Sequence, residues 1–412
     1  MKTLTVDKRN EQLDRFENRM GKMVVGQPQA LAKLTDSFSR LIAGVHDPDS
    51  PLLTMLFLGP TGVGKTETVR SLAETVFGNK RAFTRVNCQE YSAHYNISKL
   101  LGSPPGYVGG EIRPLLAQEN LDRHHCKAVE NQSGMISEGG SKLAQLFPPE
   151  SERYLSIVLF DEVEKAHPKL WNLLLGILED GTVILGNNEE VDFRRSVIIL
   201  TTNVGSAAMG AHLGQSNIGF SSGLDLGSVN RDIAASAERE AKKVFPFELL
   251  NRFDDIITYD TLDEPHLFAI LDILIGQIHQ RSLCCAEPFL LEVSQPAKQL
   301  LVDEGTDIQY GARPLKRVVE KRVVTPISHL ICSDQIRKGD LITVDVNDGE
   351  VIFRKESGVT SWEELESLGP FPEAKWAKDD LGVKDDGGEK KKIVEEMTQV
   401  IAHAGTMTGA EE

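Results

Sequence analysis

Cysteine is scarce in this 412-residue sequence, and its pattern argues against a disulfide framework. The five cysteines are odd in number and form no C-x-x-C pair. This usage is typical of a reduced, cytoplasmic protein with buried thiols. His124-His125-Cys126 contains metal-ligating residue types, but three adjacent residues on a helix cannot all face one ion. No second ligand pair lies nearby in the sequence, which argues against a metal site there.

Basic residues are fewer than acidic residues. The chain has 45 Lys and Arg against 61 Asp and Glu, a formal net charge of −16. Phosphate-backbone contacts need clustered Lys and Arg, so this balance argues against a nucleic-acid-binding surface. Residues 356–412 hold 14 acidic and 6 basic residues, a net charge of −8. We expect this acidic tail to be largely disordered.

Long apolar runs are absent as well. No run approaches the ~20 residues that a membrane-spanning helix needs. The first 20 residues are charged throughout and lack a signal-peptide pattern. We therefore expect no membrane contact and a cytoplasmic location. Because 40% of the residues are hydrophobic, the chain can form two or three domains with ample cores.

The strongest positive signal is a G-x-x-x-x-G-K-[ST] motif between an apolar run at 52–58 and a helix-like stretch at 67–77. The motif consists of Gly59, Pro60, Thr61, Gly62, Val63, Gly64, Lys65 and Thr66. Its glycines let backbone N–H groups close around phosphates, and the helix that follows adds partial positive charge. We expect Lys65 to reach the β- and γ-phosphates of ATP and Thr66 to bind Mg²⁺. The ordinary alternative is a Gly-rich turn before a surface helix.

Two acidic residues end a second buried strand. Residues 157–160 are consecutively apolar and precede Asp161 and Glu162, which places both acids in the crevice where α/β proteins bind ligands. Asp161 suits a Mg²⁺-water contact, and Glu162 suits a base that activates water. An acidic strand end alone is usually a solvated turn, but the upstream phosphate loop favours the Mg²⁺ site. Asn203 is at the polar tip of another predicted strand, 196–203. It either contacts the γ-phosphate or the water, or is a turn residue.

The other segments predict an α/β domain followed by an α+β domain. The boundary is a helix start with an N-cap and Pro265 at 261–265. Further strands are expected at 82–86, 256–259, 289–293 and 341–353, the last with a hairpin turn at 347–349. Further helices are expected at 8–20, 112–128, 170–178, 231–244, 265–281, 295–303 and 314–332, and irregular segments at 131–152 and 204–230.

Three short segments each allow two interpretations. Val24 and Val25 either cover an adenine ring or only pack. Tyr107, held between glycines on a Gly- and Pro-rich loop, is either a buried anchor or a residue presented to a partner. Ile218 and Phe220 flank a glycine in a Ser- and Gly-rich stretch. They either pack against the domain's own core or dock on a partner.

These segments together resemble the Clp family of AAA+ ATPases, and the best match is the second ATPase module of ClpB, ClpA and ClpC. The similarity runs from about residue 13 to 353. It comprises V-V-G-Q at 24–27, the phosphate loop, G-S-P-P-G-Y-V-G at 102–109, F-D-E-V-E-K-A-H at 160–167, T-T-N at 201–203, N-R at 251–252 and Y-G-A-R-P-L-K-R at 310–317.

The resemblance implies an α/β AAA+ P-loop module with a five-stranded parallel sheet and helices on both faces, followed by a smaller α+β domain. We expect a linker helix in 1–21, a large ATPase domain in 22–261, a small domain in 262–355 and the tail in 356–412. It also implies a homo-hexamer that uses ATP and Mg²⁺ to thread unfolded or tagged proteins through a central pore.

Further residue roles follow from the resemblance alone. Tyr107 and Val108 would grip the threaded chain, and Arg252 would be an arginine finger that completes a neighbour's site. Arg313 would sense the nucleotide, and Val24 and Val25 would lie at the ATP site. Ile218, Gly219 and Phe220 match a tripeptide with which ClpA and ClpC dock on the peptidase ClpP, so a ClpP-like partner is expected.

Two rival functions stay open. A nucleic-acid motor or loader is opposed by the charge of −16 and by the Gly-Tyr-Val-Gly loop. A nucleotide-gated scaffold without translocation is opposed by the presence of Glu162 and Arg252. The sequence contains no counterpart of the ClpB middle domain, which leaves disaggregation open, and the acidic tail is not a family feature.

Overall fold

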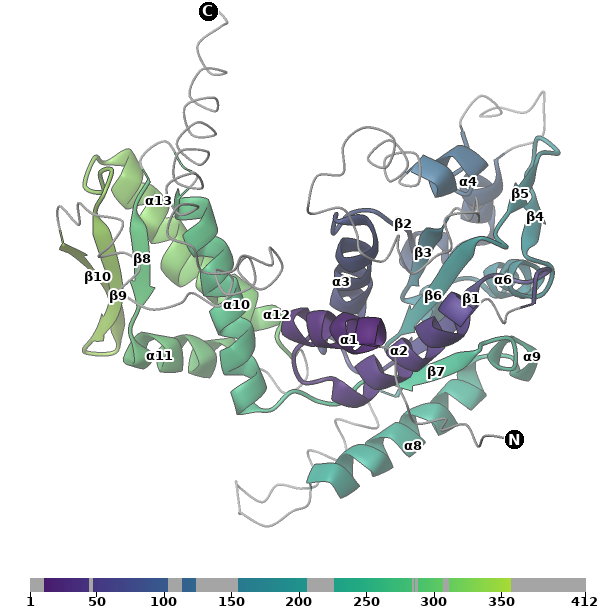
Figure 1. The fold of residues 1–412 in the computed structure, drawn as a ribbon, viewed down its shortest axis with the longest axis horizontal. Coiled ribbons are helices and arrows are strands. Elements are labelled where there is room, and N and C mark those ends of the chain that lie inside the picture. Colours follow the sequence, from purple (N-terminus) through teal and green to yellow (C-terminus); the bar gives the residue numbers. More distant parts are fainter. Residues whose placement is uncertain are drawn as a thin grey trace, which may run out of the picture. The chain divides into compact units, whose positions relative to one another are not determined.

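The computed structural model describes residues 11–43, 47–102, 113–123, 155–205, 226–283, 285, 288–306 and 311–356. The chain divides between Leu262 and Asp263 into two compact units, and Gly311 belongs with the first. Figure 1 shows the elements of both units in chain order, from purple to yellow.

A five-stranded sheet forms the centre of the first unit. Its strands are β1 (Leu53–Leu58), β2 (Thr84–Asn87), β3 (Ser156–Asp161), β6 (Ser196–Thr202) and β7 (Asp255–Thr258). They lie in the order β2-β3-β6-β1-β7, and every neighbouring pair is parallel. The predicted five-stranded parallel sheet is thus confirmed. All five strands end at one edge, here the carboxyl edge, and begin at the opposite, amino edge.

The central strands are apolar throughout because they separate two cores. Strands β1, β3 and β6 are buried along their whole length. Leu56 and Leu200 enter one core, whereas their chain neighbours Met55 and Ile199 enter the other. Side chains that alternate between two apolar layers produce the continuous apolar runs seen in the sequence.

Helices cover both faces of this sheet. Residues of α1, α2 and α3 contribute to the core that contains Met55, and residues of α6 and α9 contribute to the core that contains Leu56. The helices of the first unit are α1 (Glu11–Met23), α2 (Pro28–Ala43), α3 (Lys65–Phe77), α4 (Ser98–Leu101), α6 (Pro168–Asp180), α8 (Leu226–Val244) and α9 (Phe247–Leu250), with short 3₁₀ turns η1 (Cys88–Tyr91), η2 (His94–Ile97) and η3 (Val163–Lys165).

The helix predicted at 112–128 begins later in the structure than expected. Residues 113–117 are not helical and contain a turn at 115–116, and helical structure starts at 118. The N–H groups of Leu115 and Leu116 bond the carbonyls of Lys99 and Leu100, at 3.5 and 3.3 Å. These tertiary hydrogen bonds take the place of a first helical turn.

Two other helix boundaries also differ from the prediction, and one hairpin was not predicted. Helix α1 continues to Met23, three residues past the expected end, and α8 starts at Leu226 instead of 231. A hairpin of β4 (Thr182–Ile184) and β5 (Glu190–Asp192) was not predicted. Each of its strands has three residues, which is too short for a period-2 pattern to stand out.

The second unit is an α+β domain, as predicted. Its elements are α10 (Glu264–Leu283), β8 (Leu290–Val293), α11 (Gln295–Gly305), α12 (Arg313–Val319), the π-helical turn η4 (Glu320–Val324), α13 (Thr325–Cys332), β9 (Leu341–Asn347) and β10 (Glu350–Glu356). The strands lie in the order β10-β9-β8, with β8 parallel and β10 antiparallel to β9. Asp348 and Gly349 turn the last hairpin with positive φ of 51° and 81°, in agreement with the expected turn.

Candidate functional site

The phosphate-loop motif connects β1 to α3 at the carboxyl edge of the sheet. Gly62 and Gly64 have φ of 81° and 110°, which residues with a Cβ rarely adopt. At Gly59 an added Cβ would lie 2.9 Å from the Cβ of Tyr259. The motif's glycines are therefore required by backbone conformation and by a close approach. The loop ends at the N-terminus of α3, whose first N–H groups favour an anion.

Lys65 is 7% exposed and lies against this loop. Its ammonium donates to the carbonyls of Gly59 and Pro60, at 2.6 and 2.7 Å, and to Asn203 Oδ1 at 2.9 Å. These bonds hold one positive charge between the loop and the end of β6.

Asp161 ends β3 and is 5% exposed. Its Oδ1 accepts from the Thr201 hydroxyl at 2.5 Å and lies 3.5 Å from the Thr66 hydroxyl. Its Oδ2 accepts from Arg85 Nε at 3.1 Å and from Nη2 of the same guanidinium. A carboxylate beside a hydroxyl is a hard-oxygen donor set, which fits Mg²⁺.

Glu162 follows Asp161 in a strained backbone conformation. Its φ is 58°, in the left-handed region that non-glycine residues occupy at a cost. Its N–H donates to the Thr201 hydroxyl at 3.1 Å, which fixes the strand end. The Glu162 carboxylate lies 3.5 Å from Asn203 Nδ2. Strained residues of this kind concentrate at functional sites.

Asn203 joins the two strand ends to the phosphate loop. Its amide oxygen accepts from Lys65, and its amide nitrogen faces Glu162. Its backbone N–H donates to Glu164 Oε1 at 3.3 Å. The structure thus brings four predicted site residues, Lys65, Asp161, Glu162 and Asn203, to one place.

Cys88 lies beneath these acids and is fully buried. Burial, followed by the charges of Asp161, Glu164 and Glu162, raises the pKa of the Cys88 thiol far above its usual range. The thiol is therefore neutral and unreactive near neutral pH.

Gln27 ties the phosphate loop to the end of β7. Its side-chain amide donates to the carbonyls of Val63 and Asp260, at 3.2 and 2.9 Å, and accepts from the Asp260 N–H at 2.9 Å. Nearby, Val24 is 4% exposed and packs in the core, whereas Val25 is half-buried in a turn. Val24 also lies next to the phosphate loop, since a Cβ added at Gly64 would be 3.9 Å from its Cγ1. The predicted contact of Val24 and Val25 with ATP stays a prediction.

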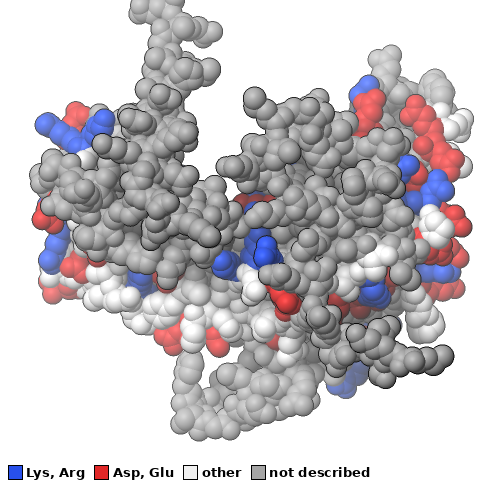
Figure 2. All heavy atoms as spheres, viewed as in Figure 1, with Lys and Arg blue, Asp and Glu red and all other residues white. Residues whose placement is uncertain are grey.

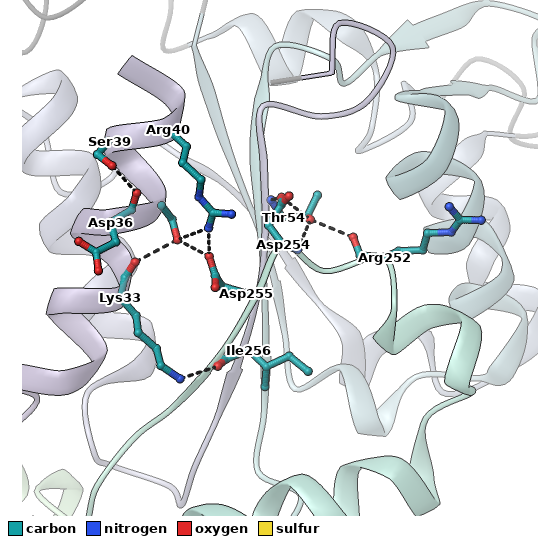
Figure 3. Close-up of polar contacts among 10 residues, drawn as sticks. Lys33, Asp36, Ser39, Arg40, Thr54, Arg252, Asp254, Asp255 and Ile256 are labelled. Carbon is teal, nitrogen blue, oxygen red and sulfur yellow. Dashed lines mark hydrogen bonds and ion pairs between the residues drawn. The ribbon is translucent and has the colours of Figure 1, made fainter. Parts of the chain in front are cut away.

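Arg252 lies at the amino edge, away from the four residues gathered at the carboxyl edge. Thr54, the second residue of β1, donates from its hydroxyl to the Arg252 carbonyl at 3.0 Å. Figure 3 shows the Arg252 side chain pointing away from Thr54. Its guanidinium pairs with Glu179 of α6 at 2.6 Å, and both side chains are about half exposed.

Of the remaining predicted site residues, one belongs to the second unit and the others lie outside the described residues. Arg313 begins α12 in the second unit and is exposed. The other candidate residues and segments lie outside the described residues: Tyr107, Val108, His124, His125, Cys126, Ile218, Gly219, Phe220 and the irregular segment at 131–152.

Three features of the described residues bear on other partners. On the face drawn in Figure 2, described acidic and basic side chains are interspersed, and the described part of this face shows no basic stripe. Among the described residues, none of the helices has the length and apolar character to cross a membrane. The same residues contain no group of three or more His, Cys, Asp or Glu that could hold a metal.

Comparisons with known proteins agree with this geometry. The family model for the AAA domain (Cdc48 subfamily) matches residues 50–129 and 132–256, and that for the C-terminal, D2-small domain of ClpB protein matches residues 262–344. The chain belongs to the Clp family of AAA+ ATPases. This family membership implies nucleotide binding.

Individual relatives of this Clp-family chain support the assignment. It is 34% identical over 344 residues to the negative regulator of genetic competence ClpC/MecB of Bacillus subtilis, covering 84% of this chain and 38% of that protein. It is 34% identical over 346 residues to the chaperone protein ClpB of Aquifex aeolicus, covering 83% and 30%. Its fold is similar to that of Hsp104 in the S. cerevisiae Hsp104:casein complex, with a TM-score of 0.66, 25% identity and coverage of 85% of this chain and 53% of that one. The chain spans about a third of the length of these two curated relatives.

Sequence reasoning missed three polar residues of the site. Arg85 lies between the buried residues Thr84 and Val86 on β2. A charged residue between two buried strand positions was the only sequence signal that could have indicated its role. Thr201 and Glu164 lie inside two of the motifs given above. Their contacts to the site residues, however, depend on the order of the strands in the sheet. A motif alone does not give that order.

Proposed function

We propose that this chain hydrolyses ATP and uses the energy to unfold proteins, as the ATPase module of a Clp-type machine. The observation that carries the proposal is the contact of Asn203 with both Lys65 and Glu162. One amide thereby links a phosphate-binding cation to an acid placed to activate water. A Gly-rich turn or a solvated strand end would not need this link.

Each residue of the carboxyl edge has a role in this proposal. The phosphate loop and Lys65 hold the phosphates, and Val24 and Val25 lie at the adenine. Thr66 and Asp161 hold Mg²⁺, which when bound offsets the charge on the phosphate oxygens. Glu162 accepts a proton from the attacking water, and Asn203 orients that water or the γ-phosphate. Arg313 reports the nucleotide state to the second unit.

Arg252 acts on a neighbouring copy in this proposal. Its backbone lies beside Thr54, and the phosphate loop starts five residues later, at Gly59. At ~3.3 Å per residue, the strand between them spans roughly 16 Å, which is longer than an arginine side chain. The same chain's nucleotide is therefore out of reach, and a ring, with six copies as the family resemblance implies, would supply Arg252 in trans.

The substrate and partner assignments rest on the resemblance. Tyr107 and Val108 would grip a polypeptide in the pore. Ile218, Gly219 and Phe220 would dock on a ClpP-like peptidase, where several weak contacts add up around a ring.

The test is the ATP-dependent unfolding of a tagged fluorescent protein, followed with and without a ClpP-like peptidase. We expect loss of fluorescence that requires ATP, and degradation only when the peptidase is present. Turnover stimulated by DNA but not by unfolded protein would refute the proposal, as would a ring that binds ATP without turnover.

A further inference from the structure

Arg85 bonds the Asp161 carboxylate through two N–H groups of its guanidinium. It comes from β2, the edge strand of the sheet. In the parallel pairing of β2 with β3, Arg85 is in register with Leu159 and Asn87 with Asp161. Arg85 and Asp161 are therefore on the same face of the sheet, and the long arginine side chain runs along its own strand to the carboxyl edge.

The two oxygens of Asp161 have different partners. Oδ1 faces the hydroxyls of Thr201 and Thr66, at 2.5 and 3.5 Å. Oδ2 receives two N–H groups of Arg85, from Nε and Nη2. Two bonds from a planar guanidinium to one oxygen fix the rotation of the carboxylate, because rotation would break both. The rotation that results turns Oδ1 toward Thr66.

We infer that Arg85 is a positioning residue for Mg²⁺: it holds Asp161 so that Oδ1 and the Thr66 hydroxyl face the ion together. This inference rests on the proposed function, which assigns Mg²⁺ to these two residues. In this inference Arg85 acts through Asp161 and is not itself a ligand of the ion. Groups that orient a metal-binding carboxylate typically change metal affinity 10–100-fold when removed, roughly the effect expected here.

The side chain's exposure agrees with this role. Arg85 is 47% exposed, whereas the Asp161 side chain is 8% exposed. Loss of the guanidinium therefore opens no apolar cavity, and Arg85→Ala should fold. The pair also differs from the other Arg–Asp pair on this face of the sheet, between Arg40 and Asp255, which lies at the amino edge (Figure 3).

The experiment measures how tightly a fluorescent, non-hydrolysable ATP analogue binds with Mg²⁺ and with EDTA. In the parent, Mg²⁺ should strengthen binding. In EDTA, Arg85→Ala should bind the analogue with the affinity of the parent. The Mg²⁺ concentration that gives half of the Mg²⁺-dependent increase in affinity should be roughly 10–100-fold higher than in the parent. Arg85→Lys should be intermediate, since it keeps the charge but not the two-pronged contact. Arg40→Ala, the matched control, should follow the parent in both conditions.

Three results would overturn the inference. Equal weakening with Mg²⁺ and with EDTA would show a general structural role for Arg85. A lower Mg²⁺ requirement in Arg85→Ala would show that the guanidinium competes with the ion instead of orienting its ligand. An unchanged requirement would show that Thr201 alone holds Asp161. A parent that binds the analogue in neither condition would instead refute the proposed ATP site, and the inference with it.

Discussion

The two edges of the central sheet carry charged groups in opposite ways. At the carboxyl edge, Lys65 and Asp161 are almost fully buried, and they bond the loop carbonyl of Pro60, the Asn203 amide and the Thr201 hydroxyl. At the amino edge, Arg252 is 44% and Arg40 53% exposed, and each pairs with one surface carboxylate. Buried polar groups are costly unless all are bonded, so the carboxyl edge is preorganised. Exposed pairs contribute only ~0–1 kcal/mol, so Arg252 can leave Glu179 at little cost.

Under the proposed function, the difference between the edges explains how one chain would hold most of an ATPase site and still need a second copy. The phosphate loop, the two acids and Asn203 must be fixed relative to one another and lie on adjacent, rigid strand ends. The arginine that would complete the site has to cross to another molecule, and it lies where its partner is easily exchanged.

The largest effect should come from a substitution at the amino edge. Arg252→Ala should slow ATP hydrolysis roughly 10³–10⁵-fold, the range for arginine fingers supplied in trans. Affinity for ATP should be unchanged, because Arg252 is remote from its own chain's loop. The matched control is Arg40→Ala, also an exposed arginine at this edge, which should hydrolyse ATP at the parental rate. A parental rate for Arg252→Ala in assembled protein would contradict the role in trans.

A substitution at the carboxyl edge should give the next largest effect. Glu162→Gln should lower turnover ~10²–10⁴-fold, because glutamine cannot accept the proton of the attacking water. Steady-state phosphate release measures turnover, and binding of a nucleotide analogue should stay intact because the side chain keeps its shape. Turnover at the parental rate would show that Glu162 is not the base.

A smaller effect tests how Arg252 is held. Thr54 is buried, and its hydroxyl contacts the Arg252 carbonyl and Asp254. Thr54→Val should lower the free energy of unfolding by roughly 0.5–1.5 kcal/mol, the usual net value of a hydrogen bond. Urea denaturation measures this change. No loss of stability would mean that the hydroxyl contributes nothing to this turn.

The smallest effect should follow the loss of the surface pair. Glu179→Gln should change the free energy of unfolding by no more than ~1 kcal/mol and hydrolysis by no more than about fivefold. The same denaturation and phosphate-release assays apply. A loss as large as that of Arg252→Ala would mean that Glu179 holds the finger in its working position, and the comparison of the two edges would then fail.

Sequence reasoning predicted the carboxyl edge better than the amino edge for physical reasons. Glycines at 62 and 64 and the apolar strands are demanded by local backbone conformation and burial, so they leave a pattern in the sequence. The Arg85 contact to Asp161 depends on β2 lying next to β3. The distance of Arg252 from its own loop likewise depends on strand direction. Neither property is local, so neither could be predicted from spacing.

The central claim is that each site uses Glu162 of one copy and Arg252 of the next. The most direct measurement mixes Arg252→Ala with Glu162→Gln over a range of ratios and follows ATP hydrolysis. Native mass spectrometry or crosslinking shows whether the rings contain both variants. Each variant alone should be nearly inactive, and mixed rings should regain part of the parental rate, because some interfaces then pair an intact Glu162 with an intact Arg252. Mixed rings that remain as inactive as either variant at every ratio would contradict a site shared between copies.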